Sequence, residues 1–478
     1  MRAWGFHGLF GLSAVALVTL VLAAFVLPAP WSWGVGLAYI AYDTWLLVFH
    51  LVRSRRAVIN EISSPPPNRS GPLPSLTVVV AAFNERAVLP GCLDALRTAG
   101  AERVVVVDDG STDGTSEVLA QIHRLTWEPL ALADNASDVA LADGLSFGQS
   151  PDGWLTVIRQ PRCGKARALN RALRRISSDL VVTIDADTVL VPGGITAFAE
   201  AFARDPALTA ACGVLEPVCS PGPLAGAFAF FQRREYARAF LWRCGWAAEG
   251  SLVLISGACA AYRRQALIAA GGYDRGSLVE DYEVMYRLNA AQPGQQAAVI
   301  RQALATTDAP GSPGRFLRQR GRWFAGFIAT LWRYRSMVGD PRQGALGLVH
   351  LRIKTIDLLL PLYGLAAGLA LVVVLVRDGG LHPGVLAALA AKAVIDASLH
   401  AWAETWYQRW LGRRPRVRSV ALAIVASLAE QVFFQPLRQL GAACGWWRHL
   451  ISLRFGPDKG WQPARKVPSS LPPTGASS

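Results

Sequence analysis

Acidic and polar side chains gather where three short apolar segments of this sequence end. The segments and the residues that follow them are 76–82 with Phe83-Asn84-Glu85, 103–107 with Asp108-Asp109-Gly110-Ser111, and 180–184 with Asp185-Ala186-Asp187. A single Asp-Gly turn is ordinary loop chemistry. Three such ends in one sheet favour a ligand site, because parallel sheets bind ligands at the carboxyl ends of their strands. Carboxylates two residues apart suit Mg2+ or Mn2+, which share oxygen ligands with substrate phosphates.

A lysine follows a glycine at the start of a helical pattern, in Gly164-Lys165-Ala166. This segment is not the phosphate-binding P-loop, because Arg159 stands where that motif requires glycine and Ala166 replaces its serine or threonine. A lysine at a helix N-terminus still suits a diphosphate, helped by the helix dipole. Taken alone, the segment is a weak signal.

Two downstream segments offer groups for proton transfer and for phosphate and sugar contacts. Glu280 and Asp281 lie in an acidic run that suits a general base, although acids are also favoured at any helix start. Gln319, Arg322 and Trp323 lie on one amphipathic segment. Guanidinium and indole groups suit phosphate and sugar-ring contacts. A basic interfacial helix anchored by tryptophan is the plainer alternative.

The elements that must position these groups lie between residues 75 and 345. Short β-branched runs alternate there with helical stretches; the runs cover 76–82, 103–107, 154–159 and 180–184, and the helical stretches include 87–98 and 165–176. This alternation predicts an α/β fold with a mostly parallel sheet covered on both faces. Between two of these runs, residues 125–153 form a predicted loop with Asp134, Asp138, Asp143 and Asp152.

Composition places the rest of the chain in a membrane. Of 478 residues, 52% are hydrophobic and only 17% are charged, against about 25% in soluble domains. The net charge of +14 fits the positive-inside rule better than nucleic-acid binding, so no nucleic-acid partner is expected. The seven cysteines form no C-x-x-C pair and the seven histidines no ligand-like spacing. A reduced setting without a zinc site is therefore predicted.

Apolar runs long enough to cross a membrane lie at both ends of the chain. They cover residues 8–27, 31–52, 356–376 and 384–402, and a further run starts at residue 420. Arg53, Arg55 and Arg56 follow the second run, which predicts that the middle of the chain is cytosolic. A cleaved signal peptide is the less natural alternative. Lys392 and Asp396 should face other helices rather than lipid.

The last apolar run leaves the side of the C-terminus open. It is interrupted near Pro436 and ends in a basic tail. A single crossing places that tail outside, against the positive-inside rule, whereas a re-entrant hairpin at Pro436 places it inside, which we favour. The predicted division is an N-terminal transmembrane helix pair, a proline-rich linker, a cytosolic domain with interfacial helices, C-terminal transmembrane helices and a basic, proline-rich tail, at 1–56, 57–74, 75–345, 346–455 and 456–478.

Five motifs in this order resemble the membrane-embedded processive β-glycosyltransferases of glycosyltransferase family 2, which include cellulose, chitin, hyaluronan and poly-N-acetylglucosamine synthases. They are Asp109 in D-D-G-S, Asp185-x-Asp187, Ser256-Gly257, Glu280-Asp281 and Q-x-x-R-W at 319–323. The resemblance covers roughly residues 75–335 and looks closest to the bacterial poly-N-acetylglucosamine synthases. It implies a cytosolic GT-A-type, Rossmann-like domain joined to an α-helical transmembrane region in the inner (plasma) membrane.

The resemblance also implies roles for single residues. Those that would bind the nucleotide-sugar donor are Ala82, Phe83, Glu85, Asp109, Lys165, Asp185, Gln319, Arg322 and Trp323. Asp187, with Asp185, would hold the Mg2+ or Mn2+ that bridges the diphosphate. Asp281 would be the general base, supported by Glu280. Ser256, Gly257 and Trp323 would form the acceptor side.

The implied activity is that of an inverting, processive enzyme. It would elongate a polysaccharide from a UDP-sugar, with UDP-N-acetylglucosamine as the best guess, and move the product across the membrane. Its partners would be the donor, the growing polysaccharide, membrane lipid and a small membrane accessory subunit. The alternative is a non-processive transferase with a lipid acceptor, which the amphipathic stretches 223–241 and 315–337 would suit. A non-catalytic membrane partner or transporter would have no need of the strand-end acids.

Three departures from the family pattern limit what carries over. Val279 takes the place of the threonine common before Glu-Asp, and the gating motif F-x-V-T-x-K is absent, since 347–356 reads GLVHLRIKTI. The chain is also too short for an added cyclic-dinucleotide domain. Direct regulation of that kind is therefore not expected.

Overall fold

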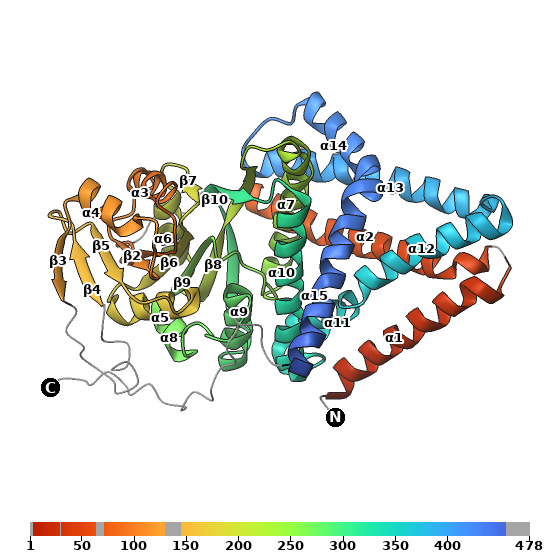
Figure 1. Cartoon of the computed structure of the whole chain (residues 1–478), viewed down its shortest axis with the longest axis horizontal. Helices are drawn as coiled ribbons and strands as arrows, with labels where there is room; N and C mark the ends of the chain where they lie inside the picture. The colour runs from red at the N-terminus through yellow and green to blue at the C-terminus, as the bar shows by residue number, and fades with distance from the viewer. Residues whose placement is uncertain (1–2, 29, 64–70, 130–144, 456–478) are drawn as a thin grey trace.

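The computed structural model of the chain describes residues 3–28, 30–63, 71–129 and 145–455. Figure 1 shows an α/β domain on one side and a group of long helices on the other. The predicted fold class, an α/β domain joined to long apolar helices, is therefore confirmed. The predicted tail at 456–478 and the acidic residues Asp134, Asp138 and Asp143 lie outside the described residues.

One mixed sheet forms the centre of the α/β domain, in the order β3-β4-β5-β2-β1-β6-β9-β8-β10-β7. Its strands are β1 (Leu76–Ala82), β2 (Val104–Asp108), β3 (Thr126–Pro129), β4 (Ser146–Gln149), β5 (Leu155–Arg159), β6 (Leu180–Asp185), β7 (Val189–Leu190), β8 (Leu208–Cys219), β9 (Cys259–Arg263) and β10 (Gln296–Ala309). Strands β5, β2, β1 and β6 are parallel, as predicted. Strand β9 runs antiparallel to both of its neighbours, whereas β8 and β10 beyond it are again parallel to each other, so the sheet is mixed rather than mostly parallel. Buried strands of either direction form apolar runs, which is why the pattern could not show the reversal.

The predicted loop at 125–153 is a second difference. Strands β3 and β4 pair antiparallel within it and extend the sheet beyond β5. Their register places Trp127 opposite Gly148. Strands this short carry too few residues to show a period of two, and this explains why sequence reasoning missed them.

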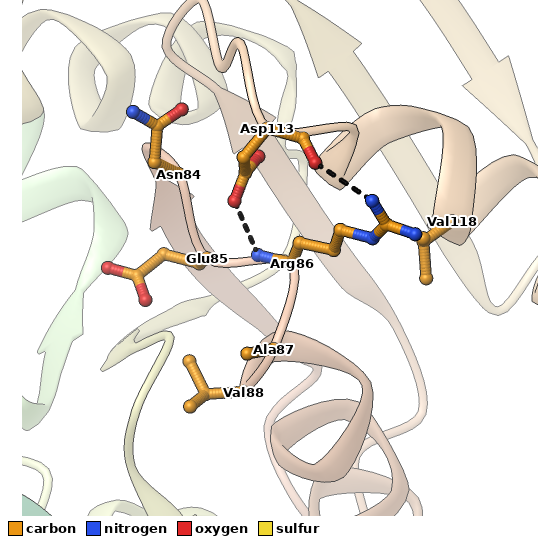
Figure 2. A pocket seen from close by; sticks show the side chains of 7 residues that line it. All are labelled: Asn84, Glu85, Arg86, Ala87, Val88, Asp113 and Val118. Carbon is orange, nitrogen blue, oxygen red and sulfur yellow. Dashed lines mark hydrogen bonds between the residues drawn. The ribbon is translucent and has the colours of Figure 1, made fainter.

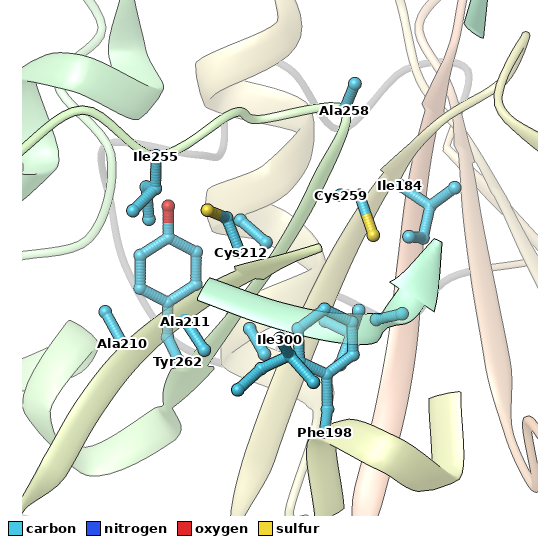
Figure 3. Close-up of a cluster of buried hydrophobic side chains, with 14 of the residues drawn as sticks. Ile184, Phe198, Ala210, Ala211, Cys212, Ile255, Ala258, Cys259, Tyr262 and Ile300 are labelled. Atoms are coloured by element: carbon cyan, nitrogen blue, oxygen red, sulfur yellow. The ribbon is translucent and has the colours of Figure 1, made fainter. Parts of the chain in front are cut away.

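Short helices lie close to the strands in the α/β domain (Figure 1). They are α3 (Leu89–Thr98), α4 (Thr115–His123), α5 (Lys165–Arg175), α6 (Gly194–Arg204), α8 (Arg264–Ala269) and α9 (Glu280–Ala291). Part of the core appears in Figure 3, where Tyr262 of β9 lies beside Ala210 of the neighbouring strand β8, and Phe198 of α6 is also buried. The small Ala210 side chain leaves room for the Tyr262 ring, and the buried side chains pack densely behind the strand ends that carry the acidic residues.

Five helical segments are long and apolar enough to cross a membrane, among the described residues: Gly5–Val26, Trp31–Ser63, Leu346–Asp378, Pro383–Trp410 and Val417–Arg454. The helices in them are α1 (Ala3–Val26), a 3-10 turn (Trp31–Trp33), α2 (Gly34–Ser63), a π-helical turn (Leu346–His350), α11 (Leu351–Asp357), α12 (Leu360–Asp378), α13 (Pro383–Trp410), α14 (Val417–Ala429), a second π-helical turn (Glu430–Phe434) and α15 (Gln435–Phe455). Helix α2 continues to Ser63, past the predicted boundary at residue 56. The last segment stays helical through Pro436, so the chain makes no re-entrant hairpin there.

Helices α7 (Ala225–Ala248) and α10 (Pro313–Arg333) join the two parts of the molecule. Helix α7 packs on α2 and α13, and α10 packs along α15, as Figure 1 shows near its centre. Two 3-10 turns, Arg335–Met337 and Pro341–Gln343, follow α10. These two helices contain most of the amphipathic stretches noted in the sequence. The α/β domain is therefore held directly against the apolar helices.

The charged residues inside the fourth apolar segment face protein, as predicted. Lys392 and Asp396 are both buried and form an ion pair with each other. The Lys392 ammonium also lies 2.8 Å from a carboxylate oxygen of Asp43 on α2. Because an unpaired charge is costly in an apolar setting, this contact fixes α13 against α2.

Candidate active site

The carboxyl ends of β1 and β2 form one connected set of turns. The amide of Asp109 donates to the carbonyl of Ala82 at 2.8 Å, and the amide of Glu85 donates to the Thr115 hydroxyl at 3.1 Å. Asn84 joins the two turns, because its amide donates to Ser111 and its side-chain oxygen accepts from the amide of Thr112. Three of the predicted donor residues, Ala82, Glu85 and Asp109, are thus held in one rigid strand-end structure.

Asp109 is buried and holds the loop between β5 and α5. Its carboxylate accepts from the Gln160 side chain at 2.6 Å and from the amides of Cys163 and Gly164, both at 2.8 Å. That loop carries Arg162, whose guanidinium carbon lies 3.7 Å from the centre of the Phe83 ring. Sequence reasoning assigned Asp109 to the donor and missed this loop. The available signal was the polar run after β5, which follows a strand end like the other three.

Lys165, the first residue of α5, connects two of the predicted catalytic segments. Its ammonium lies 2.5 Å from Asp185 at the end of β6 and 3.3 Å from Glu280 at the start of α9. Burial alone would lower the Lys165 pKa, but the carboxylates of Asp185 and Glu280 outweigh burial and raise that pKa. The lysine is therefore a permanent positive charge between the strand-end acids and the acidic helix start.

The acids around the ends of β1 and β6 carry more negative charge than their neighbours neutralise. Burial raises the pKa of Glu85 to about 7, and the carboxylates of Asp187 and Asp185 contribute to that rise. Burial and Asp185 also raise the pKa of Asp187. Asp187 accepts only weak hydrogen bonds, from the hydroxyls of Thr307 at 3.2 Å and Thr188 at 3.4 Å. A hard divalent cation would relieve this crowding of carboxylates.

The residues present fit a metal that is shared with a substrate. No group of three or more His, Cys, Asp or Glu side chains converges on a metal position in the part of the chain that the structure describes. Mg2+ commonly takes only one or two protein carboxylates together with substrate phosphates and water, and Asp185 and Asp187 match that donor set. A cation there would supply positive charge to a diphosphate.

Two backbone amides hold the carboxylate of Asp281, the predicted base. The amide of Gly257 donates to one of its carboxylate oxygens at 2.8 Å and the amide of Tyr282 donates to the other at 2.9 Å. Burial raises the Asp281 pKa, and the neighbouring Glu280 raises it further. A carboxylate held in one orientation with a raised pKa is suited to accepting a proton. Lys165 thus contacts Asp185 and Glu280, and Gly257 contacts Asp281, which follows Glu280 in the sequence.

Helix α10 brings the third predicted segment to the same region. The Arg322 guanidinium donates to the carbonyl of Leu278, two residues before α9, at 2.9 Å. The side-chain oxygen of Gln319 is buried and has no hydrogen-bond partner among the described residues. Trp323 is half-buried, and the Arg320 guanidinium carbon lies 4.7 Å from its ring. Among the described residues, no side-chain hydrogen bond or ion pair joins Gln319, Trp323 or Ser256 to Lys165, Asp185 or Glu280.

A cavity of about 450 Å³ lies beside these strand ends. Figure 2 shows its lining, which comprises Asn84, Glu85, Arg86, Ala87, Val88, Asp113 and Val118. The side chains of Glu85 and Arg86 point in opposite directions there, and the Arg86 amide donates to the Asp113 carboxylate at 3.1 Å. Of the predicted site residues, Glu85 alone lines this cavity.

The fold and the site define one class of protein: a GT-A-type α/β domain that carries acids at its strand ends and is joined to apolar helices. Two family models match the chain: "Glycosyl transferase family 2" at residues 77–269 and "Glycosyl transferase family group 2" at residues 180–391. Residues 77–391 therefore match models of family 2 glycosyltransferases, as the motifs predicted.

Curated relatives agree with this assignment. The chain is 28% identical over 295 residues to an N-acetylglucosaminyltransferase of Rhizobium sp. (strain N33), covering 58% of each chain. It is 24% identical over 302 residues to a poly-beta-1,6-N-acetyl-D-glucosamine synthase of Staphylococcus aureus (strain COL), covering 61% of this chain and 65% of that protein. The chain thus matches less than two thirds of the length of these relatives. A mannosyltransferase from Pyrobaculum calidifontis, solved with GDP-Man and Mn2+, is 19% identical at a TM-score of 0.48, covering 84% of this chain and 99% of that one.

Proposed function

We propose that this chain is an inverting β-glycosyltransferase that transfers a sugar from a UDP-sugar to a growing polysaccharide. One observation carries the proposal: Lys165 contacts both Asp185 at the end of β6 and Glu280, the neighbour of Asp281. A diphosphate-binding strand end and a base therefore share one cation. Relatives named for N-acetylglucosamine transfer support UDP-N-acetylglucosamine as the donor.

The proposed reaction assigns one role to each of these groups. An acceptor hydroxyl attacks the anomeric carbon of the donor, and its proton passes to the Asp281 carboxylate. The bond from that carbon to the diphosphate breaks on the opposite side, and UDP leaves. Lys165 and Arg322 supply positive charge to the departing diphosphate, and a divalent cation held by Asp187 and Asp185 would supply more. A single displacement inverts the anomeric centre, so an α-linked donor gives a β-linked product.

The membrane helices extend this proposal to the fate of the product. Helices α7 and α10 hold the domain against the long apolar helices, which supports a product that grows at the membrane and crosses it. The last half of α2 carries Arg53, Arg55 and Arg56. By the positive-inside rule, these residues favour a chain embedded in the inner (plasma) membrane with its α/β domain in the cytoplasm. Membrane lipid and a small membrane accessory subunit are the further partners in this scheme.

Donor profiling with the purified full chain tests the function. Each UDP-sugar is supplied with Mg2+ or Mn2+, UDP release is measured, and the length of the product is determined. We expect UDP release with UDP-N-acetylglucosamine and a ladder of lengthening products. No UDP release with any donor would overturn the transferase assignment. A single addition to a lipid would overturn processivity and establish the lipid-acceptor alternative.

A further inference from the structure

The helix that carries the Q-x-x-R-W motif is connected to the membrane helices by a chain of buried charges. We propose that Glu235 of α7 is a positioning residue for the acceptor side. Glu235 holds the Arg320 guanidinium against the Trp323 indole and, through Arg438, anchors that guanidinium to α15. The inference deepens the proposed function, on which it rests. Glu235 and Arg438 lie outside the sequence motifs, and Arg320 occupies an unspecified position within Q-x-x-R-W.

Arg320 is held on three sides. Its guanidinium lies 2.7 Å from a Glu235 carboxylate oxygen, and both side chains are only 14% exposed. The same guanidinium carbon lies 4.7 Å from the ring centres of both Phe316 and Trp323. A guanidinium over an indole is an attractive pair, and a carboxylate behind the guanidinium fixes its plane. The orientation of Trp323 therefore depends on Glu235 through Arg320.

Glu235 also belongs to a wider network that reaches α13 and α15. The Arg438 guanidinium lies 3.5 Å from both Glu235 and Glu430, and it bridges the two carboxylates. Glu430 in turn accepts from Arg238 at 2.8 Å and lies 3.0 Å from the Nε2 atom of His400. In a network of buried charges this close together, each charge needs its partner, because an uncompensated charge in such a setting is strongly unfavourable.

Close backbone packing makes α10 and α15 one unit. A side-chain carbon at Gly445 would lie 2.8 Å from the Phe324 Cβ atom and 2.9 Å from the Gly321 carbonyl oxygen. Gly441 lies one helical turn earlier and faces Arg320 in the same way. Small residues four apart let membrane helices approach this closely. A displacement of α15 would therefore reach Arg320 and Trp323 through both the backbone contact and the ion pairs.

The matched pair Glu235→Gln and Glu249→Gln tests the proposal in the full-length protein. Glu249, at the end of α7, pairs with Arg53 at 2.5 Å and contacts no residue of α10 in the network above. We expect E235Q to raise the KM for soluble N-acetylglucosamine oligosaccharides about tenfold and to leave the donor KM within about twofold. E249Q should change neither value, and Glu235→Asp, which keeps the charge, should recover part of the loss.

A spectroscopic measurement makes the test independent of turnover. The protein is labelled with 5-fluorotryptophan, and the 19F resonance of Trp323 is assigned by its loss in Trp323→Phe. We expect E235Q to shift or broaden that resonance and E249Q to leave it in place. An unmoved Trp323 resonance in E235Q would overturn the inference. This readout applies even if the wild-type protein uses no sugar donor. Equal increases in the donor KM and the acceptor KM in both E235Q and E249Q would also overturn it.

Discussion

The amide of Gly257 donates to the Asp281 carboxylate at 2.8 Å, and the two residues are so close that a side chain at position 257 would require Asp281 to shift. A Cβ atom at position 257 would lie 2.9 Å from the Asp281 Cβ atom and 3.0 Å from its carboxylate oxygen. The residue that shapes the proposed acceptor side therefore also sets the position of the proposed base.

Gly257→Ala should displace Asp281 and slow transfer without unfolding the protein. We expect kcat to fall about a hundredfold, because a base misplaced by about 1 Å loses that much. The matched control is Gly226→Ala on α7, where an added carbon meets nothing within 4 Å. A G257A enzyme as fast as G226A would contradict the proposed role of this contact.

Asp281→Asn keeps the size of the side chain and removes its ability to accept a proton. We expect kcat to fall about a thousandfold, within the usual range for loss of a general base. The donor KM should change little, since Asp281 does not contact the strand ends. UDP release is the measurement, and Asp205→Asn, at a half-buried position just after α6, is the control. Full activity in D281N would exclude this residue as the base.

The pH profile of kcat/KM should report the raised pKa of Asp281. The base works when ionised, so activity falls as the pH drops through that pKa, at a higher pH than for an ordinary aspartate near 3.9. Glu280→Gln removes a neighbouring charge that raises this pKa, so the acid limb should move to lower pH. Lys165→Met removes a charge that lowers it, so the limb should move to higher pH. An acid limb that stays in place in both variants would contradict the assignment.

Asp187→Ala should weaken divalent metal binding in the presence of UDP. We expect the Mn2+ affinity to fall at least about tenfold, as for the loss of a ligand or its support. A chelator should stop UDP release by the wild type, and added Mn2+ should restore it. Asp152→Asn, in an exposed ion pair with Arg97, is the control. Undiminished UDP release after chelation would show that transfer needs no metal.

Lys392→Met should destabilise the helices without touching the site. It leaves the carboxylates of Asp43 and Asp396 without their shared cation, which costs about 3 kcal/mol for a buried pair. The melting temperature in detergent should fall clearly below that of Arg377→Met. Arg377 is more exposed, at 36%, and pairs only with its neighbour Asp378 among the described acids. Equal melting temperatures for the two variants would show that the buried pair contributes no stability.

Local pattern by itself determined much of this protein. The runs that became β1, β2, β5 and β6, the acids at their ends and the apolar segments were all readable, because hydropathy and strand ends depend on neighbouring residues. The ordered motifs then predicted the family 2 domain, which the family models support. Which acid would take which role came from resemblance and is still a prediction.

Only the tertiary structure decided which distant groups meet. In the structure, β9 runs antiparallel to its neighbours, and β3 pairs with β4. The Asp109 carboxylate contacts the 160–164 loop, and Lys165 lies between Asp185 and Glu280. Arg320 and Glu235 meet across 85 residues of sequence, in an ion pair that no local period records. Such contacts arise when packed helices and strands bring buried charges together, and each charge must find a partner where the fold places it. The chain order shows which groups are present, and the packing determines which of them form a site.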